Sequence, residues 1–258
     1  MFTVKQREAL REWLFRLGEG DERVVAGAVV GSLAVDAADR FSDLDLTFGI
    51  ADDVPVADVL EDWTRTLIDE LDAVRLVDLE RRPTTYRVFL LPDALQLDLS
   101  MTPAARFRPA GPRFRLRFGE TAEDGSEDPT PPDPGSLFID TPAVASDIFG
   151  WGVIYALHAR ACIERGRLWQ AEHYVGAVRD HALALACLRE GVSVAQARGY
   201  DDLSDESLAR LEDAHVGALE PGTLRAALAV SLDALMREGA EARLPHAQVV
   251  ADRLAELA

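Results

Sequence analysis

The chain has 258 residues, with 45 acidic and 27 basic side chains, a formal net charge of −18 and a hydrophobic fraction of 48%. It is too apolar for a disordered chain and long enough to bury one large core or two modest ones. The negative charge argues against nucleic acid and anionic membranes as partners, because both attract basic surfaces. A cationic small molecule fits the charge better, although solubility alone also accounts for it.

The sequence favours a cytoplasmic protein. Its first residues lack the apolar core of a signal peptide, and no stretch reaches membrane-spanning length without charge. Lys5 is the only lysine, and the many alanines and arginines are typical of a GC-rich, bacterial gene. The two cysteines, Cys162 and Cys187, have no metal-ligand or redox spacing, so we expect them to be buried in helices.

The first 118 residues mix helical and strand patterns. Apolar residues at helical spacing predict helices over 4–17 and 56–71. In 113–118 the alternation of arginine with apolar residues would place three arginines on one strand face. Strand patterns occur over residues 24–30, 43–48, 73–79, 86–91, 94–101 and 113–118, with a tight turn at Pro92-Asp93 joining the fourth to the fifth.

The remaining residues contain only a polar segment and helical patterns. Residues 119–140 carry seven acidic residues, no basic residue and four prolines, which is typical of a linker or loop. The predicted fold class is therefore α+β, with a mixed-sheet domain over 1–118, the linker over 119–140 and an all-α bundle over 141–258. Helices are expected over 147–164, 168–190, 204–219, 221–238 and 244–257.

The residues that point to chemistry are Gly31-Ser32 and, ten residues later, Asp43-Leu44-Asp45. A glycine at a strand end lets the backbone approach a ligand, and the next serine can donate to a phosphate. Asp43 and Asp45 lie on one face of a strand, where their repulsion requires a cation, and oxygen ligands favour Mg²⁺. Alternatively, both are surface residues of an ordinary edge strand.

This pattern resembles the signature of the nucleotidyltransferase superfamily, which includes DNA polymerase beta and the antibiotic nucleotidyltransferases. In that signature Gly-Ser is followed by a spacer of about ten residues and by Asp, an apolar residue and Asp. The resemblance implies Mg²⁺ at Asp43 and Asp45 and attack of an acceptor oxygen on the α-phosphate of ATP, with release of pyrophosphate.

The resemblance also implies nucleotide-binding residues and a third carboxylate. Besides Gly31 and Ser32, we assign Ser42 and Arg115 to nucleotide binding. Arg115 belongs to an acid-free basic stretch that also contains Arg106, Arg108, Arg113 and Arg117, and most of these also fit a solvated strand face.

Asp98 lies between Leu97 and Leu99, and it is the candidate for the third carboxylate that the superfamily takes from a neighbouring strand. It would complete the metal site or act as general base. The alternative is an acid on a half-exposed hairpin face, since the sequence does not determine strand register.

The helical half resembles the bundle of aminoglycoside and lincosamide nucleotidyltransferases, which bind the acceptor in a cleft beside the sheet domain. Residues 165–174, continued by Arg179-Asp180, look like the second helix of that bundle. The resemblance makes Glu172 a candidate general base. The alternative is an ordinary helix with a packed Trp169 and a polar face.

The leading hypothesis is a Mg²⁺-dependent nucleotidyltransferase that transfers AMP from ATP to a hydroxyl of a cationic small molecule, such as an aminoglycoside. The alternatives are a nucleotidyltransferase that modifies a protein or RNA, as in toxin–antitoxin pairs, and a degenerate nucleotide-binding module. The histidines at 158, 173 and 181 lack the spacing of a zinc site.

Overall fold

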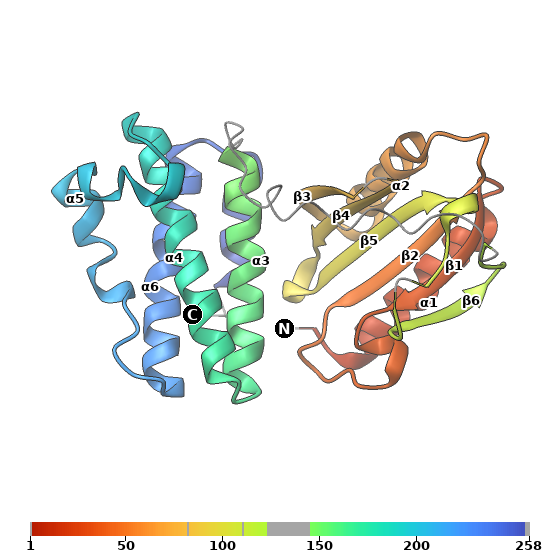
Figure 1. Cartoon of the computed structure of the whole chain (residues 1–258), viewed down its shortest axis with the longest axis horizontal. Coiled ribbons are helices and arrows are strands. Elements are labelled where there is room, and N and C mark those ends of the chain that lie inside the picture. The colour runs from red at the N-terminus through yellow and green to blue at the C-terminus, as the bar shows by residue number, and fades with distance from the viewer. Residues whose placement is uncertain (1, 82, 110, 123–144, 256–258) are drawn as a thin grey trace. The chain divides into compact units, whose positions relative to one another are not determined.

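The computed structural model describes residues 2–81, 83–109, 111–122 and 145–255. The chain divides into two compact units, Met1–Leu137 and Phe138–Ala258. The described residues of the first form a mixed sheet with two α-helices, and those of the second are helical (Figure 1), so the predicted α+β class is confirmed. None of the helices in these ranges combines the length and apolar character that a membrane span requires.

Six strands form the sheet of the first unit, in the spatial order β3-β4-β5-β2-β1-β6. Their bounds are β1 Val24–Val30, β2 Leu44–Ile50, β3 Val74–Arg81, β4 Thr84–Leu90, β5 Gln96–Pro103 and β6 Phe114–Phe118. The central strands β2 and β5 are parallel, and every other neighbouring pair is antiparallel. The hairpin predicted at Pro92-Asp93 joins β4 to β5.

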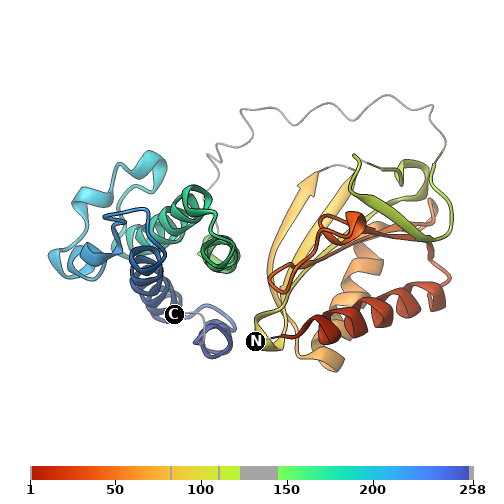
Figure 2. The same ribbon diagram turned by 90° about the horizontal axis from the view of Figure 1, so that it is seen from below.

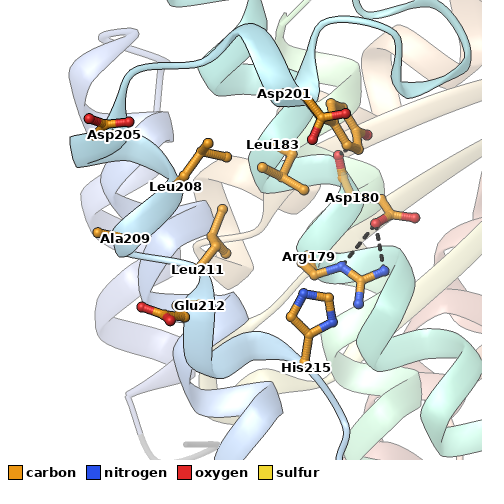
Figure 3. A pocket seen from close by; sticks show the side chains of 11 residues that line it. Arg179, Asp180, Leu183, Asp201, Asp205, Leu208, Ala209, Leu211, Glu212 and His215 are labelled. Atoms are coloured by element: carbon orange, nitrogen blue, oxygen red, sulfur yellow. Dashed lines mark hydrogen bonds and ion pairs between the residues drawn. The ribbon is translucent and has the colours of Figure 1, made fainter.

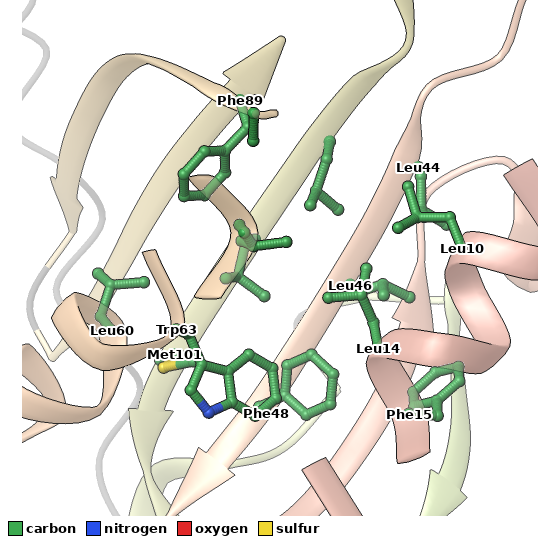
Figure 4. Packing of buried hydrophobic residues seen from close by; sticks show 14 of the residues in the cluster. Leu10, Leu14, Phe15, Leu44, Leu46, Phe48, Leu60, Trp63, Phe89 and Met101 are labelled. Carbon is green, nitrogen blue, oxygen red and sulfur yellow. The ribbon is translucent and has the colours of Figure 1, made fainter. Parts of the chain in front are cut away.

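Two helices, α1 (Val4–Gly20) and α2 (Val56–Leu71), lie on one side of the sheet (Figure 2). The core between these layers takes alternate residues of the strands, with the ring of Phe48 4.9 Å from Trp63 of α2 and 5.9 Å from Phe15 of α1 (Figure 4). Because side chains alternate along a strand, the intervening residues of β2 and β5 point to the opposite face. That face carries the candidate site.

The expected separation of arginines and apolar residues over 113–118 is wrong. The pairing of β6 with β1 shifts between Phe118 and Leu116, which leaves Arg117 as an extra residue in a β-bulge. Phe118 packs on the main core beside Phe15, whereas Phe114 packs against Phe107 in a separate cluster. The bulge interrupts the period of two on which the prediction rested.

The first residues of the predicted linker pack on the sheet unit. Gly119 has a φ of +75°, and a Cβ atom there would lie 2.1 Å from the carbonyl oxygen of Val25. The N–H of Ala122 donates to the carbonyl of Phe107 at 2.8 Å. Residues 123–140 of the predicted linker lie outside the described residues.

The helices of the second unit are α3 Ala145–Glu164, α4 Leu168–Glu190, α5 Asp205–Ala209, α6 Pro221–Glu241 and α7 Ala247–Leu254. The long helices α3, α4 and α6 pack against one another. Small residues bring α3 and α6 close, because a Cβ at Gly239 would lie 2.5 Å from Phe149 and one at Gly152 would lie 2.7 Å from Leu235. Both cysteines are buried in these helices, as expected.

Two predicted helices are shorter than the pattern indicated. The helix expected over 204–219 consists of α5 and a separate 3-10 turn, Glu212–Ala214, which packs against α6. The buried apolar residues in and directly before this segment are Leu203, Leu211 and Ala214. Their spacing fits separate short turns as well as one continuous helix. The helix expected over 244–257 begins only at Ala247, because Pro245 disfavours helix before it and His246 has a φ of +66°.

Candidate metal centre

The three aspartates singled out in the sequence lie together on the face of the sheet away from the helices. One carboxylate oxygen from each of Asp43, Asp45 and Asp98 lies within 4.8 Å of the others. Asp43 directly precedes β2, and Asp45 of β2 lies opposite Asp98 of β5 in the parallel register. The parallel pairing at the centre of the sheet thus joins residues that are more than fifty positions apart.

Burial and like charge make this cluster unfavourable in its ionised form. Burial, followed by the neighbouring charges of Asp43 and Asp98, raises the pKa of Asp45 to about 9. Burial, followed by the charge of Asp43, raises the pKa of Asp98 to about 7, against a hydrogen bond from Gln96 Nε2 to Asp98 Oδ1 of 2.8 Å. A divalent cation would offset this repulsion, and three carboxylates form a donor set that fits Mg²⁺.

The turn after β1 touches the carboxylate cluster. Gly31 has a φ of +69°, and a Cβ atom there would lie 2.2 Å from Asp45 Oδ2. Glycine is therefore required at position 31 for two reasons: it adopts the positive φ, and it leaves room for the carboxylate of Asp45. The hydroxyl of the next residue, Ser32, is buried and has no hydrogen-bond partner among the described residues. Such an orphaned group next to a charge cluster is available to a ligand.

The loop before Asp43 is held by Arg7, which the sequence analysis missed. Arg7 of α1 is 2% exposed, and its Nη1 donates to the carbonyls of Asp39 at 2.6 Å and Ser42 at 2.8 Å. The hydroxyl of Ser42 accepts a hydrogen bond from the N–H of Asp39 and donates one to Asp39 Oδ1. The described contacts of this hydroxyl therefore stabilise the loop. A role of Ser42 in nucleotide binding stays a prediction. The sequence does contain one sign that Arg7 is buried, because Arg7 shares helical spacing with Leu10.

Arg115 braces the turn that follows Gly31 and Ser32. Its Nε donates to the carbonyl of Ala34 at 3.0 Å, and its Nη2 lies 2.8 Å from a carboxylate oxygen of Asp36. The side chain is 49% exposed. Arg115 therefore stands beside the Gly31-Ser32 turn, and its contact with a triphosphate stays a prediction.

Glu172 lies half-buried on α4 of the helical unit, and its role as general base stays a prediction. The alternative of a packed tryptophan on this helix is wrong, because Trp169 is 78% exposed. Arg179 of the same helix forms an ion pair with its neighbour Asp180 at 2.9 Å.

The helical unit contains a cavity of about 580 Å³ between α4 and the segment around α5 (Figure 3). Leucines at positions 183, 208 and 211 contribute apolar side chains to its lining. The acidic residues that line it are Asp180, Asp201, Asp205 and Glu212, and the basic ones are Arg179 and His215. This lining has more acidic than basic groups, like the chain as a whole.

No protein-family model and no curated protein matches the chain. Among solved structures, the chain is similar to an aminoglycoside 6-adenyltransferase from Bacillus subtilis, with 11% sequence identity and a TM-score of 0.33 over 96% of this chain and 91% of that chain. A similarity of this size does not show a shared fold or activity. The function must be argued from the residues of the site.

Proposed function

We propose that the protein is a Mg²⁺-dependent nucleotidyltransferase that transfers AMP from ATP to a hydroxyl of a small molecule. The observation that carries this proposal is the cluster of Asp43, Asp45 and Asp98, whose oxygens lie within 4.8 Å of one another against the Gly31 turn. Half-buried acids that repel one another are retained where an ion neutralises them. A purely structural role would leave this arrangement without a benefit.

Each group has a distinct role in the proposed reaction. The three aspartates would hold Mg²⁺, which supplies neutralisation of phosphate charge and orientation of the reacting oxygens. The backbone N–H groups of the Gly31-Ser32 turn and the orphaned Ser32 hydroxyl would donate to phosphate oxygens. Phosphoryl transfer depends mainly on positioning and charge stabilisation, which these residues provide.

The reaction exchanges one phosphorus–oxygen bond for another. The acceptor hydroxyl oxygen forms a bond to the α-phosphorus of ATP while the bond from that phosphorus to the bridging oxygen of the β-phosphate breaks. Pyrophosphate leaves with the electron pair of the broken bond. The proton of the hydroxyl passes to a carboxylate, and the candidates are Asp98 and Glu172.

The net charge of −18 favours a cationic acceptor of the aminoglycoside type, and the acidic lining of the helical cavity agrees with it. We would incubate the protein with ATP and Mg²⁺ and measure pyrophosphate release with aminoglycosides, lincosamides, neutral sugars and sugar phosphates. The proposal predicts acceptor-dependent release that a chelator abolishes. If no acceptor elicits release and ATP fails to bind in the presence of Mg²⁺, the proposal is wrong.

A further inference from the structure

A second cavity, of about 420 Å³, lies in the sheet unit next to the carboxylate cluster. Thr47 and Ser100 line it, and they are paired across β2 and β5 two residues beyond Asp45 and Asp98. Residues two apart on a strand share a face and lie about 7 Å apart. The cavity and the three carboxylates therefore occupy neighbouring places on the face of the sheet away from α1 and α2.

The charged residues described in the lining of this cavity are all arginines. Arg106, Arg108 and Arg113, from the segment between β5 and β6, contribute to its wall, and no acidic residue is among the described residues that line it. The whole chain has 45 acidic and 27 basic residues, so a lining whose described charged residues are all arginines departs from the overall composition. Guanidinium groups bind phosphate and carboxylate oxygens through paired hydrogen bonds and repel ammonium groups.

The lining of the cavity includes a buried hydroxyl group that the described protein contacts leave unused. Thr102 is 5% exposed, it lines the cavity, and its Oγ1 has no hydrogen-bond partner among the described residues. Tyr86 adds a phenolic hydroxyl to the same lining. A buried hydroxyl without a partner is unfavourable unless a ligand or a bound water completes it. Arginines together with hydroxyl groups, one of them unused, form a lining that suits an anion with several oxygens.

We infer that this cavity binds a phosphate or carboxylate group of the acceptor. The assignment to an acceptor rests on the proposed nucleotidyl transfer, because the cavity adjoins the carboxylates at which an acceptor hydroxyl would react. The acceptor is then an anionic, hydroxyl-bearing small molecule such as a sugar phosphate. The charge lining the site decides which molecule binds there, so this class replaces the cationic acceptor that the net charge favours.

Calorimetric titration of ribose 5-phosphate into the full chain, without Mg²⁺ or ATP, tests the anion site. We expect ribose 5-phosphate to bind and ribose to bind at least roughly tenfold more weakly. Arg113→Gln and Thr102→Val should each weaken binding of the phosphate ester by roughly fivefold to tenfold. The matched control is Arg65→Gln, because Arg65 is an exposed arginine of α2, on the helix-covered side of the sheet, and this change should leave the affinity unchanged.

Three results would overturn the inference. Equal affinity for ribose and ribose 5-phosphate would exclude an anion site. If thermal unfolding confirms that Arg113→Gln and Thr102→Val both fold and their affinity for ribose 5-phosphate is unchanged, this cavity is not the binding site. Displacement of ribose 5-phosphate by ATP with Mg²⁺ would assign the anion to the donor nucleotide and not to an acceptor.

A separate variant distinguishes this inference from the proposed function. Asp45→Asn should abolish nucleotidyl transfer but leave the binding of ribose 5-phosphate intact, because Asp45 does not line the cavity. If the wild-type chain binds ribose 5-phosphate but transfers no nucleotide to any acceptor, the anion site is supported and the proposed reaction is refuted.

Discussion

The two units surround their least exposed acidic residues with different neighbours. Glu238 of α6 is 5% exposed and accepts hydrogen bonds from Arg189 Nε at 2.8 Å and Nη2 at 3.0 Å. In the sheet unit, Asp45 and Asp98 face each other and Asp43, and their pKa values rise. The chain thus neutralises a buried acid with arginine where the acid is structural. The aspartate cluster differs because, in our account, its counter-charge is a bound cation.

The largest effect that would test this contrast is on catalysis. Asp45→Asn should lower acceptor-dependent pyrophosphate release by at least about 10³-fold, because it removes a charge that the reaction needs. In the presence of a chelator its unfolding temperature should not fall below that of the wild type, because the metal-free cluster already disfavours an ionised Asp45. The matched control is Asp53→Asn, an exposed acid outside the cluster, which should keep full activity. Substantial turnover in Asp45→Asn would refute the metal assignment.

The opposite outcome is expected for the paired acid of the helical unit. Glu238→Gln should reduce the free energy of unfolding by about 2 kcal/mol, because it removes the buried carboxylate that pairs with Arg189. The loss is smaller than for an isolated buried pair, because Arg189 keeps its ion pairs with Glu190 and Glu241. The side chain of Arg189 is 30% exposed, which moderates the loss. Urea denaturation measures the change. Asp233→Asn is the control, since Asp233 is a 72% exposed partner of Arg237 and its loss should change stability by less than about 0.5 kcal/mol.

Addition of Mg²⁺ should raise the unfolding temperature of one of these two variants and not of the other. Mg²⁺ at about a hundred times its dissociation constant should stabilise the wild type by about 2.7 kcal/mol, seen as a rise in unfolding temperature. Glu238→Gln should keep this rise, and Asp45→Asn should lose it. A rise of equal size in Asp45→Asn would mean that Mg²⁺ binds elsewhere.

A smaller effect, on pH dependence, concerns a paired acid within the sheet unit. Hydrogen bonds from Arg23, and then from Trp63 Nε1 at 3.0 Å, lower the pKa of Asp21 to about 2. The pKa of an aspartate in the unfolded chain is about 3.9, so the folded form binds the proton less readily. The ionised carboxylate of Asp21 therefore makes its full contribution to the free energy of unfolding above about pH 4. It is lost as the pH falls through about 2.

We expect Asp21→Asn to be less stable than the wild type by up to about 2 kcal/mol above pH 4, and the difference to shrink as the pH falls toward 2. Urea midpoints measured across this range would show it. A difference that stays constant with pH would mean that the ionised carboxylate of Asp21 does not stabilise the fold.

The sequence predicted the strands β1 and β2 and the face of Asp45 well, because local patterns determine these positions. Short β-branched and alternating runs defined β1 and β2, and the period of two placed Asp45 away from the leucines of the same strand. The contact between Gly31 and Asp45 follows from the strand–turn–strand order but could not be measured from it. The pairing of Asp45 with Asp98 required the parallel register of β2 and β5, which no local pattern contains.

The features that escaped prediction depend on tertiary contacts. Arg7 reaches the carbonyls of a loop more than thirty residues away, so its spacing on a helix identifies its face but not its partner. The bulge at Arg117 arises from pairing with β1. The arginine-lined cavity requires the segment between β5 and β6 to fold over the sheet, and from sequence alone its arginines suit a solvated face equally well.

The most direct test of the account is the binding of Mn²⁺, a spectroscopic probe for the Mg²⁺ site, followed by electron paramagnetic resonance. We predict saturable Mn²⁺ binding to the wild-type chain that Mg²⁺ displaces, that Asp45→Asn and Asp98→Asn abolish, and that Asp53→Asn retains. Mn²⁺ binding of equal strength in the wild type and in both cluster variants, or no binding to the wild type, would contradict the claim that these aspartates form a metal centre.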